Sequence, residues 1–142
     1  AYPPIADARV LDLFAGTGAL GFEALSRGAA QAVFVDDGAR AGALIRANAA
    51  KLKLSDEVTL IRKDATYLAR CGSEPFGLVF LDPPYGRGLG EKALAAALAG
   101  GWLAPGAVVV WEESGDVAWP AGLLPADDRR YGGTRVHIGR AG

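Results

Sequence analysis

Four consecutive residues, Asp82-Pro83-Pro84-Tyr85, place an acid, two rigid residues and an aromatic ring directly after an apolar run. The Asp82 carboxylate and the Pro83 carbonyl can each accept a hydrogen bond from an exocyclic amine. Pro84 restricts the backbone beside that carbonyl, and the Tyr85 ring offers a face on which a planar base can stack. Alternatively, the two prolines do no more than end a strand. We expect the four residues to hold the amine of a nucleobase.

An amine on an aromatic ring is a poor nucleophile, because its lone pair is delocalised into the ring. Two acceptors that hold its hydrogens favour a pyramidal nitrogen and aim the lone pair outward. With a methyl sulfonium opposite the amine, methyl transfer would depend mainly on placement and electrostatic positioning. A base held in this way must be unstacked or flipped out of its strand.

The stretch from Val10 to Gly28 also points to a ligand. An apolar run leads into the glycine turn Ala15-Gly16-Thr17-Gly18, and a helical segment follows. A strand, a glycine turn and a helix together present backbone amides and a helix N-terminus to a nucleotide-like ligand. Gly16 and Gly18 permit a tight turn that a ligand can approach closely, and Thr17 is expected to cap the helix. The alternative is an ordinary turn that binds nothing.

Four acids each lie just after an apolar run that is typical of a strand; they are Asp36, Asp64, Asp82 and Glu112. Asp12 lies within the first such run. In open α/β sheets, ligands bind along the carboxyl edge of the strands, so these acids predict a polar site there. Asp36 follows the glycine turn by about 20 residues, where an acid accepts the ribose hydroxyls of a nucleoside cofactor. Asp64 is equally suited to cap a helix.

Five apolar runs separated by helical segments predict a parallel sheet with helices on both faces. The expected strands are Val10–Phe14, Ala32–Val35, Val58–Ile61, Leu78–Leu81 and Ala107–Trp111. The expected helices run from the glycine turn to Arg27, over Gly38–Leu52, briefly from Asp64 to Leu68, and over Glu91–Ala99. Helical spacing in the second of them predicts a core-facing stripe of Ala41, Leu44, Ile45, Asn48 and Leu52.

From Leu123 to the end, a turn at Tyr131-Gly132-Gly133 and the alternation over Thr134–Ile138 predict a closing β-hairpin. The fold class is therefore a Rossmann-like α/β domain. We expect a mostly parallel seven-stranded sheet with helices on both faces and an antiparallel strand from the C-terminal hairpin.

Composition limits the remaining possibilities. The 142 residues suffice for a single domain over 1–142, with a lead-in over 1–9. We find neither a membrane-spanning apolar run nor a signal-peptide pattern, and one cysteine, Cys71, fits a reducing cytoplasm. A net charge of −1 argues against a dedicated nucleic-acid clamp. Without a Cys or His cluster, no metal site is expected.

The residues Gly16 to Gly21 also satisfy the G-x-G-x-x-G pattern of dinucleotide-binding enzymes. A nicotinamide- or flavin-dependent oxidoreductase, or a dinucleotide sensor, is therefore an alternative. The acid and bulky residues before the turn count against it, because the usual run there is β-branched. The motif at Asp82 to Tyr85 counts against it more strongly.

The segment DLFAGTGALGFEALSRGA together with DPPY resembles the class I S-adenosylmethionine-dependent methyltransferases. More narrowly, the chain from Val10 to about Ile138 resembles the bacterial RsmD family, which methylates the N2 amine of a guanine in small-subunit (16S) ribosomal RNA. The resemblance implies S-adenosylmethionine as the cofactor. As partners it implies ribosomal RNA or an assembling small ribosomal subunit, for a cytoplasmic, monomeric enzyme that acts without a membrane or a metal.

By this resemblance, each motif takes a role. The glycine turn, Ala15 to Gly18, would hold the methionine end of the cofactor together with Asp12. Asp36 would bind the ribose, and Asp64 with Ala65 would contact the adenine. Asp82, Pro83, Pro84 and Tyr85 would hold the target amine.

Three departures from the family pattern keep alternatives open. Asp36 stands where many relatives have Glu. Tyr85 stands where the family commonly has Phe, and Tyr is also frequent there in adenine-N6 DNA or RNA methyltransferases. The basic N-terminal extension of the family is expected to be missing, which leaves a non-catalytic cofactor-binding subunit as a further alternative.

Several other residues are assigned less specific roles. Arg87, in the loop after the motif, either reaches a substrate phosphate or is solvated. Arg129, Arg130 and Arg135 form either a small RNA-facing patch or an ordinary charged face. His137 is expected to point away from Val136 and Ile138. The three tryptophans are expected to pack in the core; they are Trp102, Trp111 and Trp119.

Overall fold

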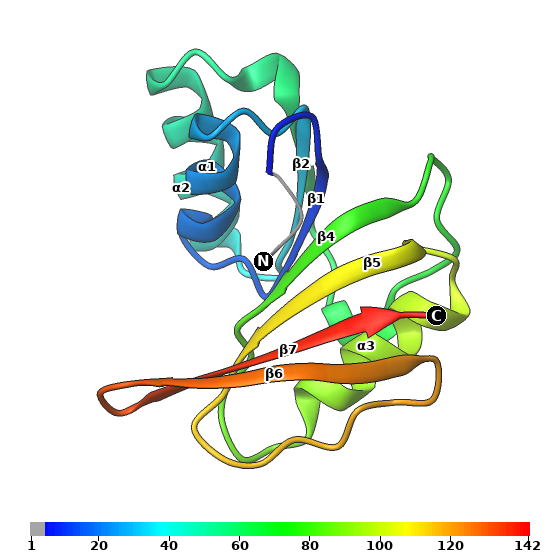
Figure 1. Ribbon diagram of the computed structural model, residues 1–142. Coiled ribbons are helices and arrows are strands. Elements are labelled where there is room, and N and C mark those ends of the chain that lie inside the picture. The colour runs from blue at the N-terminus through cyan, green and yellow to red at the C-terminus, as the bar shows by residue number, and fades with distance from the viewer. Residues whose placement is uncertain (1–4) are drawn as a thin grey trace.

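A seven-stranded sheet in the order β3-β2-β1-β4-β5-β7-β6 forms the centre of the computed structural model, which describes residues 5–142 (Figure 1). The strands are β1 (Arg9–Leu13), β2 (Gln31–Val35), β3 (Val58–Ile61), β4 (Phe76–Leu81), β5 (Leu103–Glu112), β6 (Leu123–Tyr131) and β7 (Thr134–Ala141). The first five pair in parallel, and β7 runs antiparallel to both β5 and β6. The predicted fold class is confirmed. Residues 1–4 of the expected lead-in lie outside the described residues.

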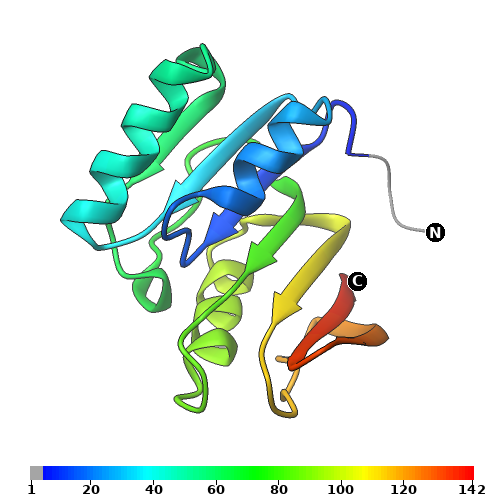
Figure 2. The same cartoon turned by 90° about the vertical axis from the view of Figure 1, so that its left-hand side faces the viewer.

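Helices cover both faces of the sheet (Figure 2). On one face, α1 (Ala19–Ser26) and α2 (Ala39–Lys51) pack on a cluster that includes Val10 and Phe34. On the other face, α3 (Leu89–Ala99) packs on a cluster that includes Leu11 and Trp111. Because successive strand residues point to opposite faces, the continuous apolar runs supply both clusters. Two short 3₁₀ helices, η1 (Ser55–Glu57) and η2 (Ala65–Tyr67), flank β3.

The predicted core stripe of α2 is wrong in part. Leu44 and Leu52 are 40% and 53% exposed, whereas Ile45 is fully buried and Ala41 and Asn48 are half-buried. The buried row is Gly42, Ile45 and Ala49. A Cβ on Gly42 would lie 2.9 Å from Cδ of Arg62, so the small residues, not the leucines, face the neighbouring strand. Close packing through glycine and alanine turns the leucines toward solvent.

The expectation that the three tryptophans serve packing is confirmed. Trp102 and Trp111 are buried, and Trp119, half-buried, packs edge-on against Trp111 at a centroid distance of 5.2 Å. His137 is buried beside Trp111, while Val136 and Ile138 pack in the cluster beneath α1 and α2. The expected orientation of His137 is therefore confirmed.

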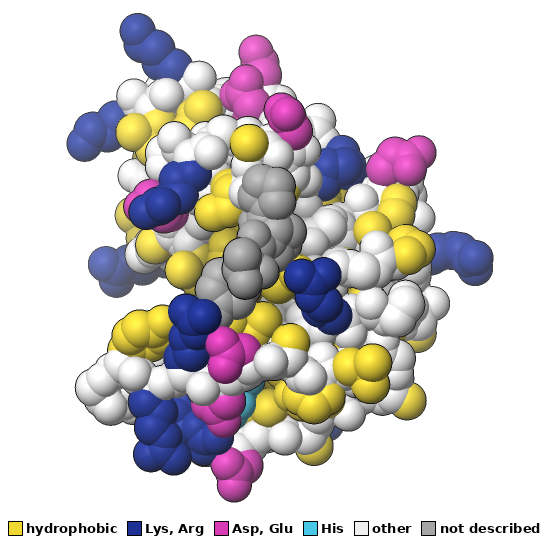
Figure 3. Space-filling view, in the orientation of Figure 1, with side chains coloured by type: hydrophobic (Ala, Val, Ile, Leu, Met, Phe, Trp, Pro, Cys, Tyr) yellow, Lys and Arg dark blue, Asp and Glu magenta, His cyan; other side chains and the backbone are white. Residues whose placement is uncertain are grey.

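Charged side chains are spread over the surface in both signs. On the face shown in Figure 3, Lys and Arg side chains lie mainly around the rim, and a mixed basic and acidic group covers part of the β6–β7 hairpin. This distribution agrees with the net charge of −1. Within residues 5–142, no helix has both the length and the apolar character needed to cross a membrane.

Candidate functional site

The glycine turn begins where β1 ends, with a residue in an unusual backbone conformation. Phe14 has a φ of 57°, in the left-handed region, and Gly16 and Gly18 follow with φ values of 59° and 81°. The Ala15 amide donates to the Val35 carbonyl at 3.0 Å, which ties the turn to the end of β2. A non-glycine residue at positive φ costs of order 1–3 kcal/mol, so its surroundings must hold Phe14 there.

Asp36, the acid at the end of β2, holds this turn from the side. Its Oδ2 accepts a hydrogen bond from the Gly16 amide at 2.9 Å, and its Oδ1 accepts one from the Gly38 amide at 2.8 Å. The carboxylate is half-buried and fixed in orientation. Because each carboxylate oxygen can accept two hydrogen bonds, one acceptor position on each oxygen remains for a ligand hydroxyl.

Two other glycines of the G-x-G-x-x-G pattern serve packing. A Cβ on Gly21 would lie 2.6 Å from Cζ of Phe34, and one on Gly18 would lie 3.1 Å from Cε1 of the same ring. The pattern therefore brings α1 close to β2, which is the role of the third glycine in such turns. The predicted cap at Thr17 is wrong: Thr17 is exposed, and Gly18 is the N-cap, without a side-chain hydrogen bond.

Asp12 lies beneath the turn and is 2% exposed. Its Oδ2 accepts a hydrogen bond from the Gly21 amide at 3.1 Å, so it holds the first turn of α1 against β1. Burial raises the pKa of Asp12 to about 8; the Gly21 amide lowers that pKa, and the charges of Asp82 and Asp36 raise it further. A buried carboxyl with this pKa is largely protonated at neutral pH.

A cavity of about 250 Å³ opens beside the glycine turn. Ten residues line it: Phe14, Val35, Asp36, Asp37, Lys63, Asp64, Ala65, Pro84, Arg87 and Leu89. It therefore brings three of the predicted cofactor residues together from two strand ends, with Asp36 after β2 and Asp64 and Ala65 after β3. Asp64 caps η2, as one interpretation expected, because its Oδ1 accepts from the Thr66 amide at 2.9 Å. A Cβ on Gly16 would meet nothing within 4 Å, so space lies open above the turn.

A second cavity, of about 460 Å³, adjoins the first. Its lining contains the whole motif from Asp82 to Tyr85, together with Phe14, Asp36 and Asp37. Phe14, Asp36, Asp37 and Pro84 line both cavities, so the predicted ribose residue Asp36 and the motif face one continuous site. Phe14 connects this site to the glycine turn, but the predicted residues Ala15 to Gly18 are not among the lining residues of these two cavities. Pro83 is buried, whereas Asp82 and Tyr85 are exposed and accessible to a substrate.

Acids beyond the motif add negative charge to this edge of the sheet. Leu81 of β4 pairs with Trp111 of β5, so the next residue on each strand, Asp82 and Glu112, lie at neighbouring positions. Partial burial raises the pKa of Asp82; partial burial and then the charge of Asp82 raise the pKa of Glu112. Desolvation raises the pKa of Glu113, and Glu91 raises it further. The site suits a ligand that carries positive charge or hydrogen-bond donors.

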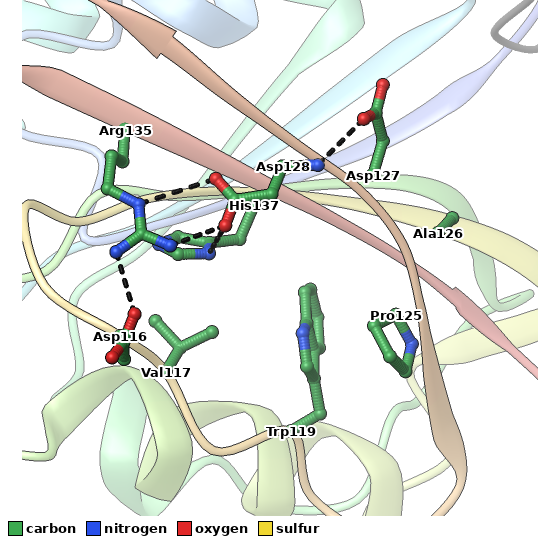
Figure 4. Close-up of a pocket in the computed structure, with 9 residues that line it drawn as sticks. All are labelled: Asp116, Val117, Trp119, Pro125, Ala126, Asp127, Asp128, Arg135 and His137. Carbon is green, nitrogen blue, oxygen red and sulfur yellow. Dashed lines mark hydrogen bonds and ion pairs between the residues drawn. The ribbon is translucent and has the colours of Figure 1, made fainter.

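Figure 4 shows a separate cavity of about 480 Å³ between β6 and the connection that precedes it. There the Arg135 guanidinium binds the Asp128 carboxylate and also that of Asp116, at 2.8 Å. His137 Nε2 lies 3.0 Å from the Gly115 carbonyl. Arg135 therefore ties the connection to the hairpin, and of the two interpretations given for it above, the RNA-facing one does not hold.

Besides Arg87, five lining residues of the continuous site lay outside the sequence-based assignment: Phe14, Val35, Asp37, Lys63 and Leu89. Phe14 and Asp37 line both cavities, and Lys63 lines the first. Asp37 and Lys63 are next in sequence to the predicted Asp36 and Asp64, so their positions beside predicted site residues could have indicated them. The backbone conformation of Phe14 has no signature in the sequence. Arg87, considered for a substrate phosphate, is exposed and lies on the wall of the first cavity.

Comparison with known proteins gives a consistent result. Residues 1–140 match the family described as conserved hypothetical protein 95. The chain is 41% identical over 126 residues to ribosomal RNA small subunit methyltransferase D of Escherichia coli (strain K12), covering 88% of this chain and 62% of that protein. The enzyme of the same name from Haemophilus influenzae is 35% identical over 117 residues, covering 80% of this chain and 61% of that one. The chain thus spans less than two thirds of either relative.

Among solved structures, the putative methyltransferase yhhF from Escherichia coli superposes with a TM-score of 0.86 and 33% sequence identity, covering 96% of this chain and 77% of that one. An S-adenosylmethionine-dependent methyltransferase from Mesorhizobium loti has a TM-score of 0.77 at 14% identity, which shows a common fold. The sheet and its helices are therefore those of a class I methyltransferase.

Proposed function

Because the chain belongs to the RsmD family, described as conserved hypothetical protein 95, we propose that it methylates the N2 amine of a guanine in small-subunit ribosomal RNA. S-adenosylmethionine is the proposed cofactor. One observation carries the proposal: the cavity beside the glycine turn, lined by Asp36, Asp64 and Ala65, adjoins the cavity that the motif from Asp82 to Tyr85 lines, and the two share four residues. A cofactor held at the turn and a base held at the motif would therefore meet.

The residues at the turn fit this cofactor. Gly16 leaves open space for a ligand, and the fixed carboxylate of Asp36 retains acceptor positions for two ribose hydroxyls. Asp64 and Ala65 form the far wall, where an adenine ring would lie. Asp12 supports the turn from below through the Gly21 amide, which makes it a positioning residue. When bound, S-adenosylmethionine supplies an electrophilic methyl group on a positively charged sulfur.

The motif from Asp82 to Tyr85 would hold and orient the target amine. Asp82 Oδ and the Pro83 carbonyl accept the two amine hydrogens, so the nitrogen lone pair points toward the cofactor cavity. Burial of Pro83 fixes its carbonyl, and exposure of Tyr85 leaves its ring free to stack on the base. After the nitrogen gains the methyl carbon, the Asp82 carboxylate is placed to accept the proton that the nitrogen loses.

The acids at the carboxyl ends of the strands would contribute to cofactor binding through their charge. The carboxylates of Asp36, Asp82 and Glu112 surround the site with negative charge, which favours a cationic cofactor over its neutral product. We also propose that the enzyme acts as a monomer in the bacterial cytoplasm, on ribosomal RNA or on an assembling small subunit, without a metal.

An adenine N6 amine is the second candidate, and Tyr85 is the observation that favours it. The two acceptors of the motif hold either amine equally well. The discrimination would have to come from other contacts along the base edge. Family membership favours guanine.

Calorimetric titration of the chain with S-adenosylhomocysteine, with NAD as the control ligand, tests the cofactor. We expect binding of the first and not of the second. NAD binding without S-adenosylhomocysteine binding would overturn the proposal and make the motif a simple strand terminator.

Transfer of a labelled methyl group, followed by nucleoside analysis, tests the substrate. Small ribosomal subunits and protein-free ribosomal RNA from cells that lack the modification serve as alternative substrates. N2-methylguanosine is the expected product. N6-methyladenosine would establish the second candidate, and cofactor binding without transfer to any RNA would indicate a non-catalytic subunit.

A further inference from the structure

The turn of the β6–β7 hairpin lies on the side of the sheet where the parallel strands have their carboxyl ends, which is also the side of the motif. In the pairing register, Leu81 lies beside Trp111, Trp111 opposite His137, and His137 opposite Asp128. These four residues form one row across the sheet, and three strand spacings put Asp128 at ~14 Å from Leu81. Asp82 lies one residue beyond this row on β4. Tyr131 lies three residues beyond it on β6 in the same direction, a distance of ~10 Å along the strand.

The end of the hairpin is exposed. Tyr131 is 59% exposed and pairs with Thr134 across the turn Gly132-Gly133, and Arg130 is exposed beside it. Alternation along the strand puts Tyr131 and Arg130 on opposite faces of the same tip. In Figure 1 the hairpin extends beyond the body of the sheet at its turn. Tyr131 belongs to neither of the two core clusters, so its ring is available to a ligand.

The other two arginines of the hairpin already bind acids. Arg129 Nε lies 2.9 Å from Asp127 Oδ2, and Arg135 binds Asp128 and Asp116. Figure 3 shows the resulting mixture of basic and acidic side chains over the hairpin. The tip therefore exposes one aromatic ring and the guanidinium of Arg130, whose charge also acts on Asp128. A single nucleic-acid strand that crosses the turn can present a base to the ring on one face and a phosphate to the guanidinium on the other.

We propose that the hairpin tip binds the single-stranded RNA that flanks the target nucleotide, with a neighbouring base stacked on Tyr131 and a phosphate bound by Arg130. The inference rests on the proposed function. A base held at Asp82 has left its stack, so the strand on one side of it must continue across the surface. The tip lies along the same edge, within the reach of a short run of nucleotides.

Addition of a partner strand to the outer edge of β6 fits the structure less well. Pro125 provides no backbone donor, a register shift interrupts the ladder between Pro125 and Asp127, and charged residues follow. These features protect an edge strand from pairing with another chain. A protein that extends the sheet is therefore disfavoured as the occupant of this hairpin.

Equilibrium binding to a fluorescently labelled single-stranded RNA with one central guanine, in the presence of S-adenosylhomocysteine, tests the stacking. We expect Tyr131→Ala to weaken the binding roughly tenfold or more and Tyr131→Phe to retain it. Leu124→Ala is the matched control, because Leu124 is 68% exposed at the opposite end of β6. Equal affinities for Tyr131→Ala and the Leu124 control would overturn the proposal.

Salt dependence tests the phosphate contact. We expect Arg130→Ala to reduce the slope of log Kd against log salt by about 0.7, the value for one phosphate contact to a single strand. Arg140→Ala, an exposed arginine at the far end of β7, should leave the slope unchanged. An unchanged slope in Arg130→Ala, or no RNA binding by a chain that binds S-adenosylhomocysteine, would overturn the hairpin proposal alone. Failure to bind S-adenosylhomocysteine would instead count against the proposed function.

Discussion

The amide of Gly16 donates a 2.9 Å hydrogen bond to Oδ2 of Asp36, across the ends of two neighbouring strands. The acid that the sequence assigns to a ribose therefore also fixes the turn that we propose to hold the rest of the cofactor. The other oxygen of Asp36 accepts from Gly38, so one side chain orders the loops after β1 and β2 together. We therefore expect cofactor affinity and local stability to be linked at this residue.

Replacement of Asp36 should affect both properties. Asp36→Ala leaves the Gly16 and Gly38 amides without their acceptors, and each lost partner of a half-buried amide costs about 1–3 kcal/mol. We expect a lower free energy of unfolding and at least tenfold weaker binding of S-adenosylhomocysteine. Denaturant titration and calorimetry measure the two effects. Asp56→Ala, at an exposed acid in η1, is the control, and unchanged values in Asp36→Ala would contradict this role.

Asp82 should matter for transfer and not for cofactor binding. Asp82→Asn keeps an acceptor oxygen but removes the charge and the carboxylate that would take the proton, and Asp82→Ala removes the acceptor as well. We expect methyl transfer to fall by roughly 10²-fold or more, by analogy with the loss of one preorganised polar group in an active site. The affinity for S-adenosylhomocysteine should change little. Near-normal transfer by Asp82→Asn or Asp82→Ala would refute the mechanism.

Activity should also fall at low pH for the same reason. Asp82 must be ionised to accept the amine hydrogen, and partial burial raises its pKa above the ordinary value of 3.8. Protonation as the pH falls through this raised pKa therefore removes activity earlier than for an exposed aspartate. The pH profile of single-turnover transfer should show this acid limb, and the residual activity of Asp82→Asn should lack it.

Asp12 should make stability depend on pH in the opposite sense to a salt-bridged acid. Its pKa is about 8 in the folded chain and 3.8 as the reference value, so between these values the folded state binds more protons than the unfolded state. Stability then falls as the pH rises through this window, by at most about 1.4 kcal/mol per pH unit. Asp12→Asn keeps an acceptor for the Gly21 amide and should remove this component. Parallel slopes of stability against pH for the two proteins would exclude it.

Gly21→Ala should destabilise the fold through Phe34. The new Cβ would lie 2.6 Å from Cζ of that ring, which is fully buried and has no room to move. Overpacking of this kind typically costs about 1–3 kcal/mol in the free energy of unfolding. Gly72→Ala, where a Cβ meets nothing within 4 Å, is the control. The double variant Gly21→Ala with Phe34→Leu should recover part of the loss, because the smaller side chain relieves the contact.

Local patterns in the sequence were sufficient for the order of the strands and α-helices, although they did not indicate the 3₁₀ helix η1. Runs such as Leu78–Leu81 are apolar at every position, which only a strand buried on both faces explains, and Gly16 and Gly18 mark the turn by their conformational freedom. Strand ends in a parallel sheet meet at one edge, so the acids after those strands had to lie together. The residue types of the motif from Asp82 to Tyr85 were sufficient to predict that it holds an amine.

Tertiary structure decided which groups those residues contact. A hydrogen bond such as Gly16 to Asp36 joins residues on different loops, and its existence depends on how closely β1 and β2 bring their ends together. The buried row of α2 depends on the approach of Gly42 to β3, which periodicity alone does not specify, so Leu44 and Leu52 were misplaced. Pairing of Arg135 with Asp116 and Asp128 likewise arises only when the hairpin folds against the connection before it. Sequence spacing determines the faces of single elements, whereas contacts between elements depend on distances that only the packed chain defines.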